Sequence, residues 1–216
     1  MKAVLFGSIG TLIETSDIQR KSFNRAFKRK GLNWYWSRKT YSKLLKKSGG
    51  IGRIEDFARQ NGESVNAKEI WKSKTDIFNK TIVSNSISAR KGVLKIFKYA
   101  KKNNIEIGLV SSTSKKNITT IFKALEDQIS RDEFSFIGNK NLVSKPKPNP
   151  DIYFKALEIM NLERNDCLAI EDSEESAKSA INAGIQCIAF PGIYHSDEIF
   201  ESCKLKLNKL DISILK

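Results

Sequence analysis

Three short polar segments of the sequence combine side chains that bind phosphate and a divalent metal ion. Ser111 and Ser112 supply hydroxyl donors, and Lys147 supplies an ammonium group between two prolines. Glu171 and Asp172 are adjacent carboxylates, hard oxygen ligands of the kind that suits Mg²⁺. The first two segments also lead into predicted helices, whose N-termini attract anions. Together they predict a pocket for phosphate and magnesium.

Each segment also has a purely structural interpretation. A serine-rich turn usually only caps a helix, and the proline-rich segment around Lys147 can be a rigid loop. Glu-Asp after a strand is commonly a solvated turn. The three segments in this order are far more specific than any one alone, so the sequence favours a functional site.

The elements that must position these residues follow from the hydrophobic pattern. Short apolar runs alternate with helical patterns, which is typical of βαβ units and a parallel sheet. Strands are expected at residues 2–6, 105–110, 167–170 and 185–190, and helices at 92–102, 115–125, 149–160 and 174–183. Ligands of open parallel sheets bind beyond the carboxyl ends of the strands, where the polar segments lie. We therefore predict an α/β core with a parallel sheet.

A second region interrupts this alternation after the first strand, because it carries only helical patterns. Helices are expected there at residues 19–30, 40–47, 51–60 and 67–82. The predicted organisation is a core domain built from residues 1–15 and 86–216, with a helical domain inserted at 16–85.

Composition narrows the range of partners. The 216 residues include 38 Lys and Arg against 24 Asp and Glu, a formal net charge of +14. The lysines look spread through the chain and accompany no RNA-binding or zinc-finger signature. We therefore expect a positive field that attracts small anions and no specific nucleic-acid partner.

The sequence also points away from membranes and from oxidising compartments. No apolar run approaches the roughly 18 residues of a membrane span, and the N-terminal segment predicts a strand instead of a signal peptide. The three cysteines, Cys167, Cys187 and Cys203, show no CxxC pairing. Reduced thiols in the cytoplasm are the expectation.

The polar segments and their order resemble the haloacid dehalogenase (HAD) superfamily, subfamily I. Residues 2–15 look like its first motif, 110–112 its second, 147–151 its third and 171–173 its fourth. The resemblance implies a three-layer Rossmann-like core with an inserted α-helical cap. It also implies Mg²⁺-dependent hydrolysis of phosphoesters and a cytoplasmic or plastid-type location.

Three further segments make the chain most similar to the CbbY-like sugar-phosphate phosphatases, which include xylulose bisphosphate phosphatases. These segments are residues 31–36, 44–54 and 194–200. The similarity implies that substrate is contacted by residues at the pocket mouth and on the cap: Glu14, Arg20, Arg53 and Lys74.

The first motif departs from the family pattern Asp-x-Asp-Gly-Thr, because it reads Gly7-Ser8-Ile9-Gly10-Thr11. Gly7 stands in the place of the nucleophilic aspartate, and Ile9 stands in the place of the general acid/base. Glycine has no group to attack phosphorus, and isoleucine has no proton to donate. Loss of the acid alone is worth about 10²–10⁴ in rate.

The remaining positions of the resemblance imply two weakened or altered functions. Phosphate would be bound by Ser111, Ser112 and Lys147. Mg²⁺ would be held by the backbone carbonyl of Ile9 with Glu171 and Asp172, weakly or not at all without the missing carboxylate. Removing two negative charges predicts stronger binding of phosphate in this pocket.

The leading hypothesis is a HAD-like hydrolase homologue that is inactive or severely impaired and still binds phosphate or a phosphorylated metabolite. One alternative is an active Mg²⁺-dependent phosphatase with a displaced nucleophile or a metal-bound water. Another is a structural scaffold with a vestigial pocket. A protein partner is compatible with each of them.

Overall fold

The computed structural model describes residues 1–46, 49–85 and 87–216, which form two compact units. The first, called the core unit, combines Met1–Glu14 with Ile87–Lys216. The second, called the helical unit, is Thr15–Ser86. Across the described ranges, no helix combines the length and apolar character needed to cross a bilayer.

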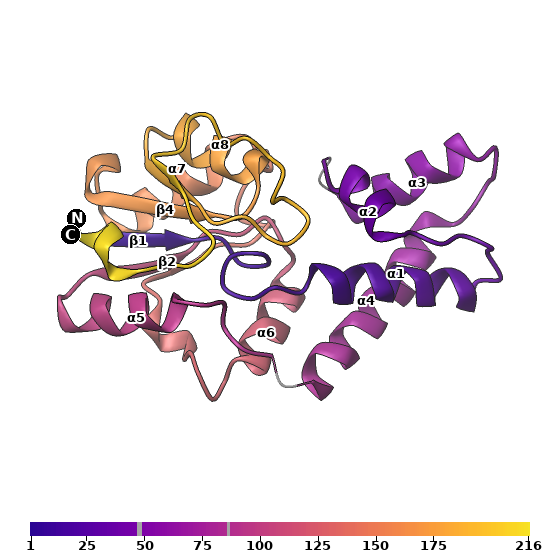
Figure 1. Cartoon of the computed structure of the whole chain (residues 1–216), viewed down its shortest axis with the longest axis horizontal. Coiled ribbons are helices and arrows are strands. Elements are labelled where there is room, and N and C mark those ends of the chain that lie inside the picture. Colours follow the sequence, from indigo (N-terminus) through magenta and orange to yellow (C-terminus); the bar gives the residue numbers. More distant parts are fainter. Residues whose placement is uncertain (47–48, 86) are drawn as a thin grey trace. The chain divides into compact units, whose positions relative to one another are not determined.

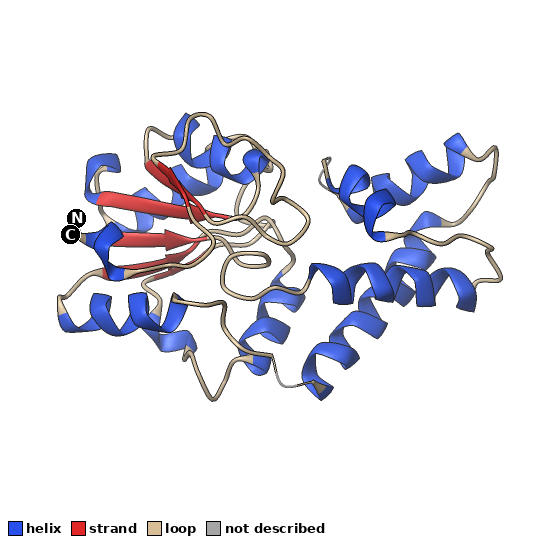
Figure 2. Ribbon diagram, in the orientation of Figure 1, coloured by secondary structure: helices blue, strands red, loops and turns tan. Residues whose placement is uncertain are grey.

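The core unit is built on a parallel six-stranded sheet (Figures 1 and 2), in the order β3-β2-β1-β4-β5-β6. The strands are β1 (Ala3–Phe6), β2 (Glu106–Leu109), β3 (Phe136–Ile137), β4 (Cys167–Glu171), β5 (Gln186–Ala189) and β6 (Leu205–Lys206). The predicted α/β class with a parallel sheet is confirmed. Strands β3 and β6 were not predicted, because two residues are too few to show an alternating pattern.

Helices cover both faces of this sheet, as parallel sheets require. They are α5 (Val93–Lys102), α6 (Lys115–Ala124), α7 (Asp151–Met160) and α8 (Glu174–Asn182), with single-turn 3₁₀ helices at Arg131–Glu133, Arg164–Asp166 and Ile212–Leu215. The alternation of β1 shows the layering: Val4 and Phe6 belong to the hydrophobic cluster that includes α5 and α6. Ala3 and Leu5 belong to the cluster that includes α7 and α8. The core unit therefore has the three predicted layers.

The helical unit contains α1 (Ser16–Arg29), α2 (Arg38–Leu45), α3 (Gly50–Gln60) and α4 (Ala67–Ser84). Its interior is aromatic: Trp36 is fully buried and packs on Phe23 and Phe27 at ring-centroid distances of 4.7 and 4.8 Å. The predicted helix at 40–47 corresponds to α2, but Lys47 lies outside the described residues, as does Ser48 of the segment 44–54. This aromatic core is separate from the two clusters around the sheet.

Candidate functional site

Lys147 and Glu171, which are distant in sequence, meet at the carboxyl ends of the central strands. The Lys147 ammonium forms an ion pair with Glu171 Oε1 and donates a hydrogen bond to the Val110 carbonyl at 3.0 Å. The side chains are 6% and 1% exposed. Because a buried charge is costly without a partner, each of these two groups neutralises the other. The structure thus joins the predicted phosphate-binding lysine to a predicted metal ligand.

The Glu171 carboxylate also lies against Gly7. Tyr153 donates its hydroxyl to Glu171 Oε1 at 2.5 Å, and burial together with the Glu171 charge raises the pKa of Tyr153 well above its ordinary value. A Cβ atom built at Gly7 would overlap Glu171 Oε2 and lie 2.6 Å from Thr11 Oγ1. The Thr11 hydroxyl is fully buried and has no hydrogen-bond partner among the described residues. The space beside Gly7 is therefore filled by the end of another acidic side chain.

Two buried hydroxyls form a second polar contact at these strand ends. Ser8 Oγ and Ser111 Oγ are 2.7 Å apart, and Ser111 Oγ accepts a hydrogen bond from the Thr113 backbone N–H at 3.2 Å. Ser112 is exposed, and its hydroxyl makes no hydrogen bond to the described part of the chain. Ser111 therefore has an additional neighbour, Ser8, from the segment that follows β1.

Asp172 lies in a different environment from its neighbour Glu171. The pKa of Asp172 is raised to about 7, mainly by burial, with the charge of His195 opposing this rise and the charge of Glu171 adding to it. His195 Nε2 is 4.0 Å from Asp172 Oδ2, and His195 Nδ1 is 2.7 Å from Glu198 Oε1. Burial by itself lowers the pKa of His195, but the Glu198 hydrogen bond and the Asp172 charge outweigh it and raise that pKa. Near neutral pH the Asp172 carboxyl is thus only partly ionised.

Arg90 ties together the loops that follow β1 and β5. Its guanidinium donates to the Gly10 carbonyl, and to the Phe190 and Pro191 carbonyls at 2.8 Å each. It also lies 3.5 Å from the centroid of the Phe190 ring. Gly10 has a positive φ of 87°, a conformation that glycine adopts without strain. Sequence reasoning missed Arg90, because a single arginine before a helix carries no motif.

Ile9 puts an apolar side chain at the position predicted for the general acid/base. It pairs in a short parallel bridge with Ile13 and packs against the cluster that includes Phe6. Glu14, predicted at the pocket mouth, belongs to the core unit, where its carboxylate accepts a hydrogen bond from the Ile193 backbone N–H at 2.8 Å. The loop after β1 is therefore held by backbone contacts and apolar packing.

The side chains as placed do not fit a resident Mg²⁺ ion. Position 7 carries no carboxylate, and Glu171 is engaged by Lys147 and Tyr153. Within the described ranges, no three His, Cys, Asp or Glu side chains are grouped so that they could hold a metal ion. Hard cations need several ionised or carbonyl oxygens, and this donor set is too small.

Two of the predicted cap cations are bound by groups of the helical unit itself. Arg20 donates to Asp17 Oδ1 and to the Trp36 carbonyl, both at 3.0 Å. Arg53 donates to the Leu44 carbonyl at 2.8 Å. Arg20 therefore fixes the segment around Trp36 against α1, and Arg53 links α3 to the C-terminal end of α2.

Lys74, the third predicted cap cation, is buried among aromatic rings. Its ammonium lies 4.9 Å from the Phe23 ring centroid and 4.8 Å from that of Phe78, and it donates to Gln19 Oε1 at 2.7 Å. Burial lowers the pKa of Lys74 to about 7, and the charge of Arg53 adds to this effect. A large part of the Lys74 population is therefore uncharged at neutral pH.

The doubly covered parallel sheet, the four strand-end segments and the helical insertion after the first strand define a haloacid dehalogenase-type hydrolase fold. The sequence profile of the haloacid dehalogenase-like hydrolase family matches residues 4–190, and the chain belongs to this family. It is 33% identical over 203 residues to the protein CbbY of Cereibacter sphaeroides, across 93% of this chain and 88% of that one.

Comparison with solved structures also shows similarity to CbbY. CbbY from Rhodobacter sphaeroides in complex with phosphate superimposes with a TM-score of 0.87 at 31% identity, covering 97% of this chain and 94% of that one. A mutant of that CbbY in complex with xylulose-(1,5)-bisphosphate gives the same values. The predicted family and its CbbY-like branch, related to sugar-phosphate phosphatases, are confirmed.

Proposed function

We propose that this protein binds a phosphorylated small molecule and does not hydrolyse it at the rate of a working phosphatase. The observation that carries this proposal is the position of Glu171, whose carboxylate lies against Gly7 and is held by Lys147 and Tyr153. A phosphoenzyme cannot form at Gly7, and Ile9 cannot protonate a leaving oxygen. Phosphoryl transfer by the family's route therefore lacks both of its reacting groups.

Glu171 is a poor substitute for the missing nucleophile. Its side chain is only 1% exposed, and one carboxylate oxygen accepts both the ammonium of Lys147 and the hydroxyl of Tyr153. Hydrogen bonding and ion pairing stabilise the ground-state carboxylate and lower its tendency to attack. These contacts favour a blocked site over an active phosphatase with a displaced nucleophile.

The binding function depends on groups that remain in the pocket. Lys147 supplies the positive charge, and Ser111 with Ser8 supplies hydroxyls. The expectation that lost aspartates strengthen phosphate binding needs a correction, because the carboxylate of Glu171 now occupies the space beside Gly7. An incoming phosphate must displace Glu171 from Lys147, so its affinity depends on that exchange.

The three free cysteines are consistent with a role in the reducing cytoplasm.

The relatives indicate which ligand to test first. One CbbY structure contains phosphate and another contains xylulose-(1,5)-bisphosphate. We therefore assay release of inorganic phosphate from xylulose-1,5-bisphosphate in the presence of Mg²⁺, and measure binding of the same compound by calorimetry. Binding without turnover is the expected result. Turnover at an ordinary enzyme rate of about 1–10³ s⁻¹ contradicts the proposal.

A matched pair of lysine variants assigns the binding. Lys147→Gln is expected to abolish the calorimetric signal, whereas Lys145→Gln, two residues away and exposed, is expected to keep it. A ligand that binds equally well to both variants contradicts the assigned site. Absence of any binding at millimolar concentration, with no rise in melting temperature, favours the scaffold with a vestigial pocket.

A further inference from the structure

The net charge of the protein is concentrated in the helical unit. Residues 15–86 contain 17 Lys and Arg against 6 Asp and Glu, a net charge of +11 in 72 residues. The core unit contains 21 against 18, a net charge of +3 in 144 residues. The impression that the lysines are evenly spread therefore misses an asymmetry. The electric field of so many positive charges attracts polyanions to this unit of the molecule.

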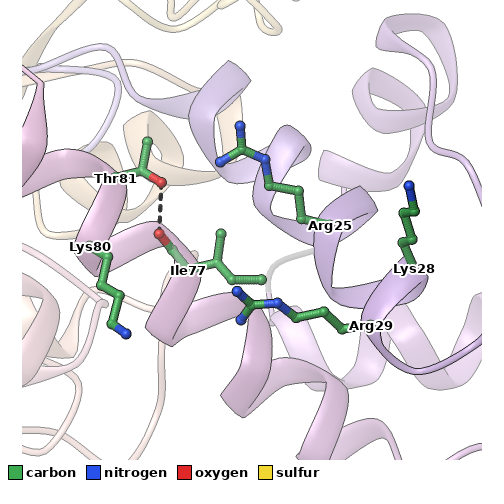
Figure 3. Close-up of a pocket in the computed structure, with 6 residues that line it drawn as sticks. All are labelled: Arg25, Lys28, Arg29, Ile77, Lys80 and Thr81. Atoms are coloured by element: carbon green, nitrogen blue, oxygen red, sulfur yellow. Dashed lines mark hydrogen bonds between the residues drawn. The ribbon is translucent and has the colours of Figure 1, made fainter.

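A groove between α1 and α4 gathers some of these charges (Figure 3). It has a volume of about 500 Å³. Its lining residues are Arg25, Lys28, Arg29, Ile77, Lys80 and Thr81. Four of the six are cations, and none of these described lining residues is acidic. The groove shares no residue with the site in the core unit or with the three predicted cap cations.

The four cations have no counter-ion among the described residues, unlike several others in the same unit. Lys30 pairs with Glu69 at 2.7 Å, and Lys21 pairs with Asp17 at 3.1 Å. By contrast, no ion pair joins Arg25, Lys28, Arg29 or Lys80 to any residue in the described ranges. Their charges are therefore available to an external anion.

The spacing of the cations suits a chain of phosphates. Arg25 and Arg29 lie one helical turn apart, at a rise of about 6 Å, and both extend toward α4 in Figure 3. Lys80 contributes a charge from the opposite wall. The Thr81 hydroxyl donates to the Ile77 carbonyl at 2.8 Å, a bond within α4 on the same wall as Lys80. A linear anion lying along the groove would meet successive cations.

We propose that this groove binds the sugar–phosphate backbone of a nucleic-acid strand without reading its bases. Phosphate contacts by Lys and Arg position a protein on nucleic acid and carry no sequence information. The described lining contains no aromatic ring on which a base could stack. Its single apolar side chain, Ile77, is buried and cannot anchor the unit in a lipid surface. The proposal is independent of ligand binding in the core unit.

The test is fluorescence anisotropy with the full chain and labelled oligonucleotides of about 20 nucleotides, single-stranded and duplex and in unrelated sequences. The groove variant combines Arg25→Gln, Arg29→Gln and Lys80→Gln. The control removes the same charge from exposed positions on α5 of the core unit: Lys98→Gln, Lys101→Gln and Lys102→Gln. We expect the groove variant to bind at least about tenfold more weakly and the control to bind within about twofold of the wild type.

Salt dependence sharpens the test, because each phosphate contact contributes about 0.9 to the slope of log affinity against log salt. The groove variant is expected to lower that slope by about 2 to 3 between about 50 and about 200 mM salt. Equal weakening in the control overturns the proposal in favour of diffuse charge. A strong preference for one sequence, absence of binding at about 50 mM salt, or binding only to anionic vesicles also overturns it.

Discussion

The two units of this protein treat charge in opposite ways. The core unit buries a few ions and gives each a partner, as with Lys147 and Glu171 or with Arg90 and three carbonyls. The helical unit exposes most of its charge, and no counter-ion pairs with the four cations of the groove within the described part of the chain. A cation at a family's phosphate position is thus not the same as an available anion site. In the core unit a carboxylate must leave first, whereas the groove needs no such exchange.

The sequence supplies a separate reporter for each unit. All three tryptophans, Trp34, Trp36 and Trp71, lie in the helical unit, and all three cysteines lie in the core unit. Cys167 and Cys187 are buried, so a thiol reagent reaches them only when the core unit opens. Tryptophan emission therefore reports on the helical unit, and labelling of Cys167 and Cys187 reports on the core unit.

The largest effect is expected from introducing aspartates at positions 7 and 9 of the core unit. The double variant Gly7→Asp with Ile9→Asp supplies a nucleophile and an acid, and the acid alone is worth about 10²–10⁴ in rate. A side chain at position 7 displaces the carboxylate of Glu171. This carboxylate is the end of a flexible side chain, so it can move. Release of phosphate from xylulose-1,5-bisphosphate, measured with Mg²⁺, is expected to rise at least about a hundredfold.

Adding Glu171→Gln to this double variant tests whether Glu171 limits the recovery. If the restored activity is blocked by overlap at position 7, the triple variant and the double variant differ in rate. No activity in either variant means that other parts of the pocket have also lost function. That result would contradict the hypothesis that changes at positions 7 and 9 are sufficient to make the core unit an active phosphatase.

The next effect concerns the buried ion pair alone. Glu171→Gln leaves Lys147 as an uncompensated buried cation, which costs about 3–5 kcal/mol when one partner of such a pair is removed. Cysteine labelling is expected to report this loss in the core unit, while tryptophan emission changes little. Millimolar phosphate is expected to protect the variant more than the wild type, because the anion replaces the missing carboxylate.

The matched control for that variant is an exposed ion pair in the same unit. Lys155 and Glu158 are 2.9 Å apart, and the Glu158 side chain is 68% exposed. Glu158→Gln is expected to change little, since surface pairs contribute weakly to stability. If Glu158→Gln and Glu171→Gln reduce the stability of the core unit equally, the distinction between buried and exposed ion pairs is contradicted.

The sequence predicted the framework of both units better than the contacts inside the site. The apolar run before Gly7 and the helical periodicity of residues 67–82 follow from side-chain alternation, which is a local property. The partnership of Lys147 with Glu171 was not predicted, because Lys147 had been assigned to phosphate and Glu171 to Mg²⁺. Tyr153 was missed because it lies within a helix and its hydroxyl reaches the site only through the fold.

Charge distribution was the other feature that a linear inspection missed. Short basic runs occur in both units, so the lysines look evenly spread along the chain. The asymmetry emerges when basic and acidic residues are counted together within each compact unit, because the helical unit is both richer in basic residues and poorer in acidic ones for its length. The groove joins residues 25–29 to residues 77–81, a pairing fixed by the packing of α1 on α4.

The third effect concerns the one buried cation of the helical unit with a strongly shifted pKa. Burial lowers the pKa of Lys74 to about 7 from 10.5. Between these two values the unfolded chain binds a proton that the folded chain does not, so stability rises with pH. The gain between pH 7 and pH 9 is about 2 kcal/mol, because one pKa unit corresponds to about 1.4 kcal/mol.

Lys74→Met removes this dependence while keeping an apolar chain against Phe23 and Phe78. Denaturant unfolding followed by tryptophan emission at several pH values is expected to show a flatter profile for this variant. The control is Lys72→Met, an exposed lysine on the same helix, which is expected to keep the wild-type profile. If the unfolding free energy of the wild type does not change over this pH range, burial does not destabilise the charged form of Lys74, and the prediction is contradicted.

The smallest effect is expected from salt, and it separates the two units most directly. Self-repulsion in the helical unit, at +11, is screened as the Debye length falls from about 10 Å at 0.1 M salt to about 3 Å at 1 M. The tryptophan-detected midpoint is expected to rise by several degrees in KCl, and the cysteine-detected midpoint to shift less, since the core unit carries only +3. The groove variant, with three charges removed, is expected to respond less to salt than the wild type. Equal salt responses of the two units would mean that the uneven charge has no energetic consequence, and the contrast between them would be only compositional.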